Sequence, residues 1–310
     1  MRLNNPLVFE QVISKPRLDS YRGYFHASTE EAIGLYMWNC QISTCLSTLI
    51  SYFEVALRNR IHWSMSDFYS RGANQSIHWY DSIRGQLKPE TQRTILKIRS
   101  LRGPRGVVTP RNPTPNPDEI VSRVTFGFWP AILGVVDQRY AHQLLPGIFP
   151  NHPLNATPSD WAIGATRKSA LAFIYEINEM RNRIAHHEPI WKFSAIKDTS
   201  VNPAVIITAA STNQAQSITR FHRLLGLLDT SLSTVNQDLY QDLSASRWRL
   251  ELNFLLTPRG IERYKNLRHV PEERMLSPAD LRRQFSLVGK GNQPVNIGGR
   301  SRFTGVFIPY

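Results

Sequence analysis

Residues 35–69 read "LYMWNCQISTCLSTLISYFEVALRNRIHWSMSDFY", and this stretch decides the fold class. The run "STEE" precedes it at residues 28–31, a capping-box pattern in which a serine and a glutamate three positions later open a helix. From there to about Ser70 only Gly34 interrupts the helical pattern. The stretch therefore predicts one bent helix or two consecutive helices.

Helical patterns fill most of the remaining chain. In residues 213–236 apolar side chains recur at alternating intervals of three and four, which is typical of one buried helix face. Further helices are predicted over residues 82–100, 159–188 and 240–256. Strand-like patterns are confined to residues 205–210 and 304–309.

The predicted architecture is an all-α helical bundle. A single helical domain is expected over residues 1–270, followed by a basic extension over residues 271–310. Residues 102–119, "RGPRGVVTPRNPTPNPDE", are rich in proline and glycine and predict a long irregular loop.

The charge balance points to a polyanionic partner. The 310-residue chain has a net charge of +13, and 29 of its 37 basic residues are arginines. Neutralising phosphates releases counterions, and the arginine fork binds phosphate in a bidentate manner. We therefore expect nucleic acid as partner, although a merely basic soluble protein has the same composition.

The sequence does not indicate a membrane protein, a metal site or a cofactor site. No run approaches the ~18 to 20 apolar residues of a membrane span, and the N-terminus "MRLNNPLVFEQ" lacks a signal-peptide core. A cytoplasmic protein is therefore expected. Cys40 and Cys45 fit neither a redox motif nor a zinc site and predict two buried thiols. Because no P-loop or GxGxxG run occurs, we expect no cofactor and no metal.

One helix carries a concentrated set of polar residues, "EMRNRIAHHEPIW" at residues 179–191. At about 100° per residue, one stripe of this helix is apolar; its members are Phe173, Ile177, Met180 and Ile184. The opposite face carries Asn182 and His186, four residues apart and hence neighbours, with Arg181 at its flank.

Arginine, asparagine and histidine on one helix face suit the cleavage of RNA. The substrate brings its own nucleophile, the 2′-hydroxyl. The enzyme then needs histidine to move protons near neutral pH and arginine to stabilise charge on the phosphate. An ordinary solvated helix face is the alternative, and on the residues alone it is the more common case.

The run "RNRIAH", Arg181 to His186, resembles the Arg-Asn-xxx-His signature of HEPN-domain ribonucleases. The wider sequence is similar to the Abi-like (abortive infection) branch of that superfamily, in stretches that follow the expected order. These stretches are "ISKPRLDSY" (13–21), "LYMWN" (35–39), "EVALRNRIHW" (54–63), "FGFWPAIL" (126–133) and "RNRIAHHEPIW" (181–191).

The resemblance implies an all-α HEPN bundle that acts as a homodimer, with the signature helices of two protomers facing one cleft. It also implies metal-independent RNA cleavage in phage defence or as a toxin, with Arg181, Asn182 and His186 as the catalytic residues. An antitoxin or a defence-system protein is a possible further partner.

The upstream phrase "EVALRNRIHW" repeats Arg-Asn-Arg-Ile and is followed by histidine. Glu54, Arg58 and His62 are spaced by four residues and share a face. Together with Asn59 they are predicted to support the same cleft, whereas a simple Glu-to-Arg surface pair is the alternative. His187 lies 100° from His186, nearer the apolar stripe, and is predicted to serve capping or packing.

Two other functions compete with the ribonuclease. The first is a non-catalytic RNA-binding or dimerising HEPN scaffold. The second is an interaction protein whose two helices form only a dimer interface.

Overall fold

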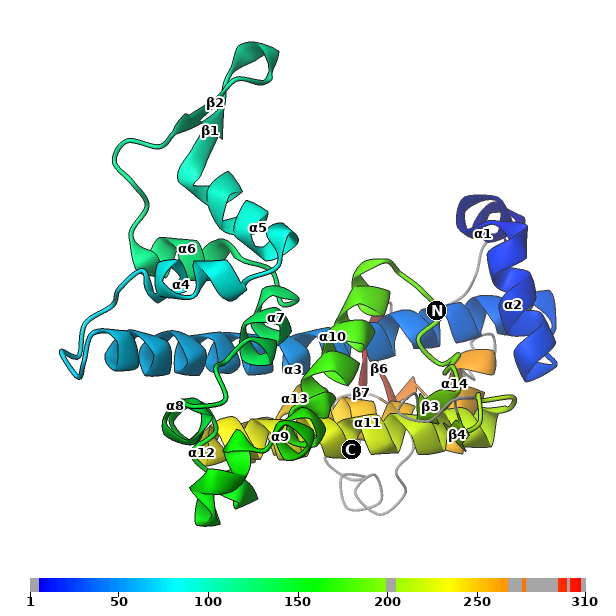
Figure 1. The fold of residues 1–310 in the computed structure, drawn as a ribbon. Coiled ribbons are helices and arrows are strands. Elements are labelled where there is room, and N and C mark those ends of the chain that lie inside the picture. The colour runs from blue at the N-terminus through cyan, green and yellow to red at the C-terminus, as the bar shows by residue number, and fades with distance from the viewer. Residues whose placement is uncertain (1–5, 199–204, 267–274, 277–294, 300–301, 308–310) are drawn as a thin grey trace. The chain divides into compact units, whose positions relative to one another are not determined.

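The structure, a computed structural model, describes residues 6–198, 205–266, 275–276, 295–299 and 302–307. Helices dominate the described residues (Figure 1), so the predicted all-α class is confirmed. The chain divides into two compact units, each assembled from separated segments. Unit 1 comprises residues 1–46, 189–222 and 246–310, and unit 2 comprises residues 47–188 and 223–245.

The longest element is α3, Thr29–Tyr69, a single helix of 41 residues. Its start has the predicted capping box: the Glu31 N–H donates to Ser28 Oγ at 3.2 Å, and the Ser28 N–H donates to a Glu31 carboxylate oxygen at 2.7 Å. Cys45 is buried but Cys40 is exposed, so the prediction of two buried thiols is wrong for Cys40.

By length and composition alone, α3 contains a window apolar enough to cross a membrane. Of that window, 39% is buried inside the fold. A core helix of a soluble protein passes the same test, so this finding assigns no location.

Within its described residues, unit 1 contains the first part of α3, the first part of α11 (Gln214–Val235), two small sheets and four further helices. The other helices are α1 (Pro6–Ile13), α2 (Lys15–Phe25), α13 (Arg247–Leu255) and α14 (Pro258–Lys265). The strands are β3 (Ile196–Asp198), β4 (Val205–Thr208), β5 (Met275–Leu276), β6 (Val295–Gly299) and β7 (Arg302–Phe307). β3 pairs antiparallel with β4, and β6 pairs parallel with β5 and antiparallel with β7. β4 and β7 overlap the two segments for which the sequence predicted strands.

Aromatic packing around Trp191 forms the core of unit 1. The Trp191 ring lies 5.1 Å from Tyr21, 4.3 Å from Tyr24 and 5.0 Å from Phe25, between ring centroids. Trp38 of α3 donates its indole N–H to the Leu255 carbonyl at 2.8 Å. Because buried indole N–H groups need an acceptor, this bond ties α3 to α13.

Unit 2 contains the rest of α3 and α11 and the helices that build the candidate site. Its α-helices are α4 (Trp79–Ser82), α5 (Pro89–Arg99), α6 (Pro117–Arg123), α7 (Phe128–Gly134), α8 (Ala141–Ile148), α9 (Gly164–Ala170), α10 (Ala172–Ala185) and α12 (Gln237–Ser244). Its 3-10 helices are η1 (Arg84–Gln86), η2 (Pro104–Gly106), η3 (Pro153–Ala156) and η4 (Pro158–Ala162). Its strands are β1 (Ser100–Arg102) and β2 (Val108–Pro110).

Four phenylalanines join α3 and α10 in the core of unit 2. Phe53 of α3 lies 6.5 Å from Phe173 of α10 and 6.1 Å from Phe126, between ring centroids. Phe173 also lies 6.3 Å from Phe149. Burying such a ring stabilises a fold by about 1.5 to 3 kcal/mol, so this contact fixes how the two predicted site helices meet.

The predicted irregular loop over residues 102–119 is only partly irregular. β1 and β2 form an antiparallel hairpin at the end of α5 (Figure 1), with Ser100 opposite Pro110 and Arg102 opposite Val108. Gly106 has a φ of 78°, which glycine adopts without a steric penalty. Proline is tolerated in the ribbon because Pro110 ends its strand and no longer needs an N–H donor.

Two predicted helices are broken in the structure. Residues 159–188 form η4, α9 and α10, because the chain turns at Leu171 (φ −100°, ψ 0°). Residues 240–256 are divided between α12 and α13, where Ser246 Oγ accepts the Arg249 N–H at 3.3 Å and caps α13. The predictions for residues 28–70 and 213–236 are each matched by one unbroken helix, α3 and α11.

Candidate active site

The signature residues lie at the carboxyl end of α10. The helix ends in a Schellman motif, in which His187 donates its N–H to the Ile184 carbonyl at 3.0 Å and Glu188 donates to the Arg183 carbonyl at 2.9 Å. His187 adopts the left-handed conformation that this motif requires, with a φ of 54°. Its predicted role in capping is confirmed, and the capping is done by the backbone.

The faces of α10 separate as the sequence predicted. Phe173, Ile177 and Met180 are buried, Ile184 is half-buried, and Ile174 is fully buried as well.

The polar side of α10 carries the three predicted catalytic residues. Asn182 and His186 are exposed, and Arg181 is half-buried. The His186 N–H donates to the Asn182 carbonyl at 3.0 Å, which places the two residues one turn apart. In the described part of the chain neither side chain makes a hydrogen bond, so the imidazole and the amide are both available to a ligand.

The helix α3 contributes the second half of the site. Glu54 is half-buried, and burial raises the pKa of its carboxyl, while the positive charges of Arg181 and Arg58 oppose that rise. The two arginines come from the two Arg-Asn-Arg-Ile phrases, one on each helix. The structure thus brings both phrases to one carboxylate.

Arg58 is half-buried, and its Nε is buried without a hydrogen-bond partner in the described residues. An unpaired donor on a charged group is costly, and in proteins such groups are usually satisfied by a partner, a water or a ligand. Arg58 therefore has hydrogen-bonding capacity left beside Glu54.

Asn59 is exposed on α3, 100° around the helix from Arg58. It belongs to the solvent-facing stripe of α3, which also carries the exposed side chains of Tyr52, Val55 and Trp63. Asn59 thus faces away from the Phe53 side that packs on α10.

His62 is placed differently from the prediction. Its imidazole is 2% exposed, and the Trp79 indole N–H donates to its Nδ1 at 2.9 Å. Its Nε2 lies 2.8 Å from Ser76 Oγ and 3.1 Å from the Asp118 carboxylate. Because both ring nitrogens are bonded within the fold, His62 holds α3 against α4 and α6 and does not line a cleft.

Arg183, the second arginine of the phrase on α10, was not singled out from the sequence. Its Nε lies 3.5 Å from the Glu188 carboxylate, which closes the Schellman turn with an ion pair. Burial lowers the pKa of the Arg183 guanidinium, and Glu188 and Glu179 oppose that shift. The signal in the sequence was the five-residue spacing to Glu188, which is informative only once the turn at His187 is known.

Carboxylates and histidines do not assemble into a metal site in the described residues, where no three His, Cys, Asp or Glu side chains gather. The expectation of a reaction without metal stays a prediction.

No protein-family model matches the chain, and neither a curated protein nor a solved structure matches it. The resemblance to Abi-like HEPN proteins therefore rests on the sequence motifs alone.

Proposed function

We propose that the protein is a metal-independent endoribonuclease of the HEPN type, related to the Abi-like proteins of phage defence and toxin systems. The observation that carries the proposal is the cluster on α10 and α3. His186 and Asn182 are exposed and lie with Arg181 at the end of α10. The positive charges of Arg181 and Arg58 both act on the carboxyl of Glu54.

His186 transfers the protons in the proposed reaction. The 2′-hydroxyl of the substrate gives its proton to a base and attacks the adjacent phosphorus. The bond from phosphorus to the 5′-oxygen breaks, and that oxygen takes a proton and leaves as a 5′-hydroxyl. The other product ends in a 2′,3′-cyclic phosphate. Histidine suits both proton transfers because its ordinary pKa is near ~6.5.

Arg181 and Arg58 stabilise the additional negative charge on the phosphate. Guanidinium donors aimed at a developing charge lower the barrier more than they strengthen substrate binding. Glu54 holds the two guanidinium groups near each other through its charge. Asn182, one turn before His186, orients the imidazole or binds a phosphate oxygen.

A homodimer completes the proposed site, because one protomer supplies only one signature and the reaction uses an acid and a base. The exposed stripe of α3 supports dimerisation: Tyr52 is 43% exposed, Val55 41% and Trp63 51%. Sedimentation of the wild type should give a dimer, and Trp63→Ser should weaken it. A wild-type monomer at working concentration would contradict this part of the proposal.

End-group analysis tests the reaction. Purified protein is incubated with single-stranded RNA in EDTA, and the products are examined for 2′,3′-cyclic phosphate and 5′-hydroxyl ends. The proposal expects both ends without added metal. Cleavage that depends strictly on added divalent metal, or products with 3′-hydroxyl ends, would count against it.

A non-catalytic RNA-binding module is the second candidate. It is favoured by the absence, within the described residues, of a hydrogen bond to the His186 ring, since catalytic bases are usually held by a third group. This candidate predicts RNA binding with steep salt dependence and no cleavage. It also predicts that His186→Ala leaves binding and biological effect unchanged.

A further inference from the structure

A pocket of about 360 Å³ lies in unit 2 between α7, α9 and the first half of α10. Its size is at the lower end of the range for small-molecule sites, about 300 to 1,000 Å³. The residues that line it are Pro130, Leu133, Gly134, Gly164, Arg167, Lys168, Leu171, Ile174 and Tyr175.

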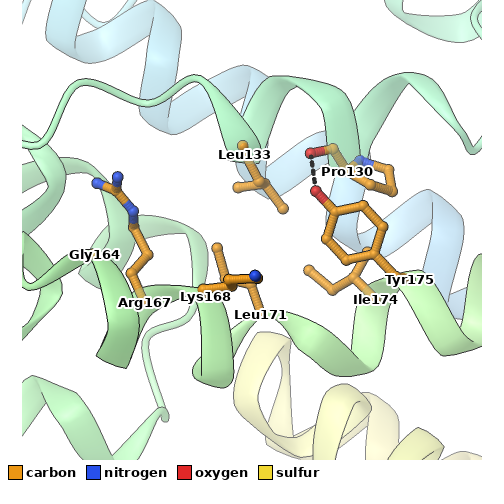
Figure 2. Close-up of a pocket in the computed structure, with 9 residues that line it drawn as sticks. Pro130, Leu133, Gly164, Arg167, Lys168, Leu171, Ile174 and Tyr175 are labelled. Atoms are coloured by element: carbon orange, nitrogen blue, oxygen red, sulfur yellow. Dashed lines mark hydrogen bonds between the residues drawn. The ribbon is translucent and has the colours of Figure 1, made fainter. Parts of the chain in front are cut away.

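The pocket is positively charged on one side and apolar on the other. Figure 2 shows Arg167 and Tyr175 on opposite sides, with Leu133 between them. Two cations, Arg167 and Lys168, line the pocket, and no carboxylate does. This composition selects an anion that has an apolar body.

Arg167 has hydrogen-bonding capacity that the fold does not use. Its Nη1 is buried and has no hydrogen-bond partner among the described residues. The charge of Arg167 acts on Asp137, but the Asp137 carboxylate already accepts a hydrogen bond from Arg139 at 2.7 Å. Arg167 lines the pocket, so the accessible N–H groups of its guanidinium can bind a phosphate oxygen there through charge-assisted bonds.

The opposite side offers a ring face and an acceptor. The Tyr175 hydroxyl donates to the Pro130 carbonyl at 3.3 Å, and its oxygen can still accept a hydrogen bond. The Tyr175 side chain is 53% exposed. A Cβ added at Gly134 would lie 3.4 Å from the Tyr175 hydroxyl, so glycine keeps this end of the pocket open.

We propose that this pocket binds a nucleoside monophosphate group. The base packs against Leu133, Ile174 and the ring of Tyr175, and the phosphate is bound by Arg167 and Lys168. Aromatic rings stack on bases of any kind, and arginine matches phosphate in a bidentate manner.

Two sources provide this chemistry, a free nucleotide and one nucleotide of an RNA strand. Tyr175 lies on the same face of α10 as Asn182 and His186, seven and eleven residues before them, or roughly 10 and 16 Å along the axis. A strand bound in the pocket thus extends along the face that carries the signature. Binding of an RNA strand in the pocket rests on the proposed ribonuclease function, whereas binding of a free nucleotide does not.

Calorimetric titration of the full chain tests the pocket, with UMP and AMP as probes and uridine, adenosine and inorganic phosphate as comparisons. The nucleotides should bind at least about tenfold more tightly than the nucleosides, because the phosphate adds one or two charge-assisted bonds. The double variant Arg167→Gln/Lys168→Gln should weaken nucleotide binding about 10- to 100-fold. Lys97→Gln on the exposed end of α5 is the matched control and should leave it unchanged. Thermal unfolding verifies that each variant is folded.

The proposal is overturned if nucleotides bind no better than nucleosides, or if the double variant binds them as the Lys97→Gln control does. Displacement of labelled UMP by a short single-stranded RNA identifies the strand as the source. RNA that binds without displacing UMP identifies a free nucleotide. His186→Ala should retain UMP binding, so a protein that binds UMP but cleaves no RNA refutes the ribonuclease and not the pocket.

Discussion

The structure assigns His62 to the packing of unit 2, and substituting it tests that assignment quantitatively. The Trp79 indole can only donate, so His62 Nδ1 must be the acceptor. The neutral ring therefore carries its proton on Nε2, which faces Ser76 and Asp118. This arrangement makes His62 a buried link between three segments.

His62→Ala should cost about 3 to 5 kcal/mol of the free energy of unfolding. Truncating a large buried side chain to alanine costs about 2 to 5 kcal/mol. Leaving the fully buried Trp79 N–H without an acceptor costs about 1 to 3 kcal/mol. Ser76 and Asp118 can turn to water and reduce the sum, since Ser76 is half-buried and Asp118 is exposed.

His62→Asn is the matched variant, because its amide oxygen lies near the former Nδ1 and can accept the Trp79 N–H. It should be about 1 to 3 kcal/mol more stable than His62→Ala, the cost of the unpaired donor. Urea unfolding followed by circular dichroism measures both values. Equal stability of the two variants, or a loss below about 1 kcal/mol for alanine, would refute the reasoning.

The pH dependence gives a second readout for His62. Burial lowers the pKa of its imidazole, and the nearby Asp118 opposes that shift. A histidine with a lowered pKa in the folded state contributes stability that is complete above its ordinary pKa near ~6.5 and is lost as the pH falls below it. Between pH 7.5 and 5.5 the wild type should therefore lose more stability than His62→Asn. An identical loss in the two proteins would show that His62 does not titrate as described.

Three further substitutions have defined outcomes. His187→Gly should keep or raise the free energy of unfolding, by up to about 1 kcal/mol, because glycine adopts the left-handed turn without strain; a clear loss in urea unfolding would show that the side chain matters. Ser28→Ala should cost about 0.5 to 2 kcal/mol through the lost cap of α3, and an unchanged melting temperature would contradict it. Glu54→Gln should raise the melting temperature at pH 7, because burial raises the pKa of Glu54 and the carboxylate is destabilising above that pKa. The gain should vanish below the ordinary carboxyl pKa, near ~4.3, and a lower melting temperature at pH 7 would mean that the two arginines outweigh burial.

The features that could be predicted from the sequence are local ones. The capping box at Ser28 and the unbroken helix α11 follow from residues within one or two turns of each other. The buried stripe of α10 follows from the same periodicity. These patterns predict the structure correctly because each depends on residues within one helix only.

The remaining features depend on contacts between distant segments. His62 and Arg58 both lie on the polar side of the same predicted helix, yet only the indole of Trp79 and the carboxylate of Asp118 make His62 structural. The turn at His187 could not be predicted from the sequence, because histidine occupies the left-handed position where glycine is usual. The β1–β2 hairpin could not be predicted from the sequence, because prolines usually indicate irregular structure. Pro110 is nevertheless tolerated at the end of β2, where no backbone N–H is needed.

The cleavage rates of two neighbouring histidine variants test the central proposal most directly. His186→Ala and His187→Ala are compared with the wild type for cleavage of single-stranded RNA in EDTA and for RNA binding at fixed salt. Loss of general acid–base catalysis costs ~10²- to 10⁴-fold in rate, so His186→Ala should lose at least ~10²-fold in rate while binding RNA nearly as tightly. His187→Ala should cleave at close to the wild-type rate, because the imidazole of His187 has no role in the proposed reaction. A folded, dimeric His186→Ala that cleaves as fast as the wild type would contradict the account.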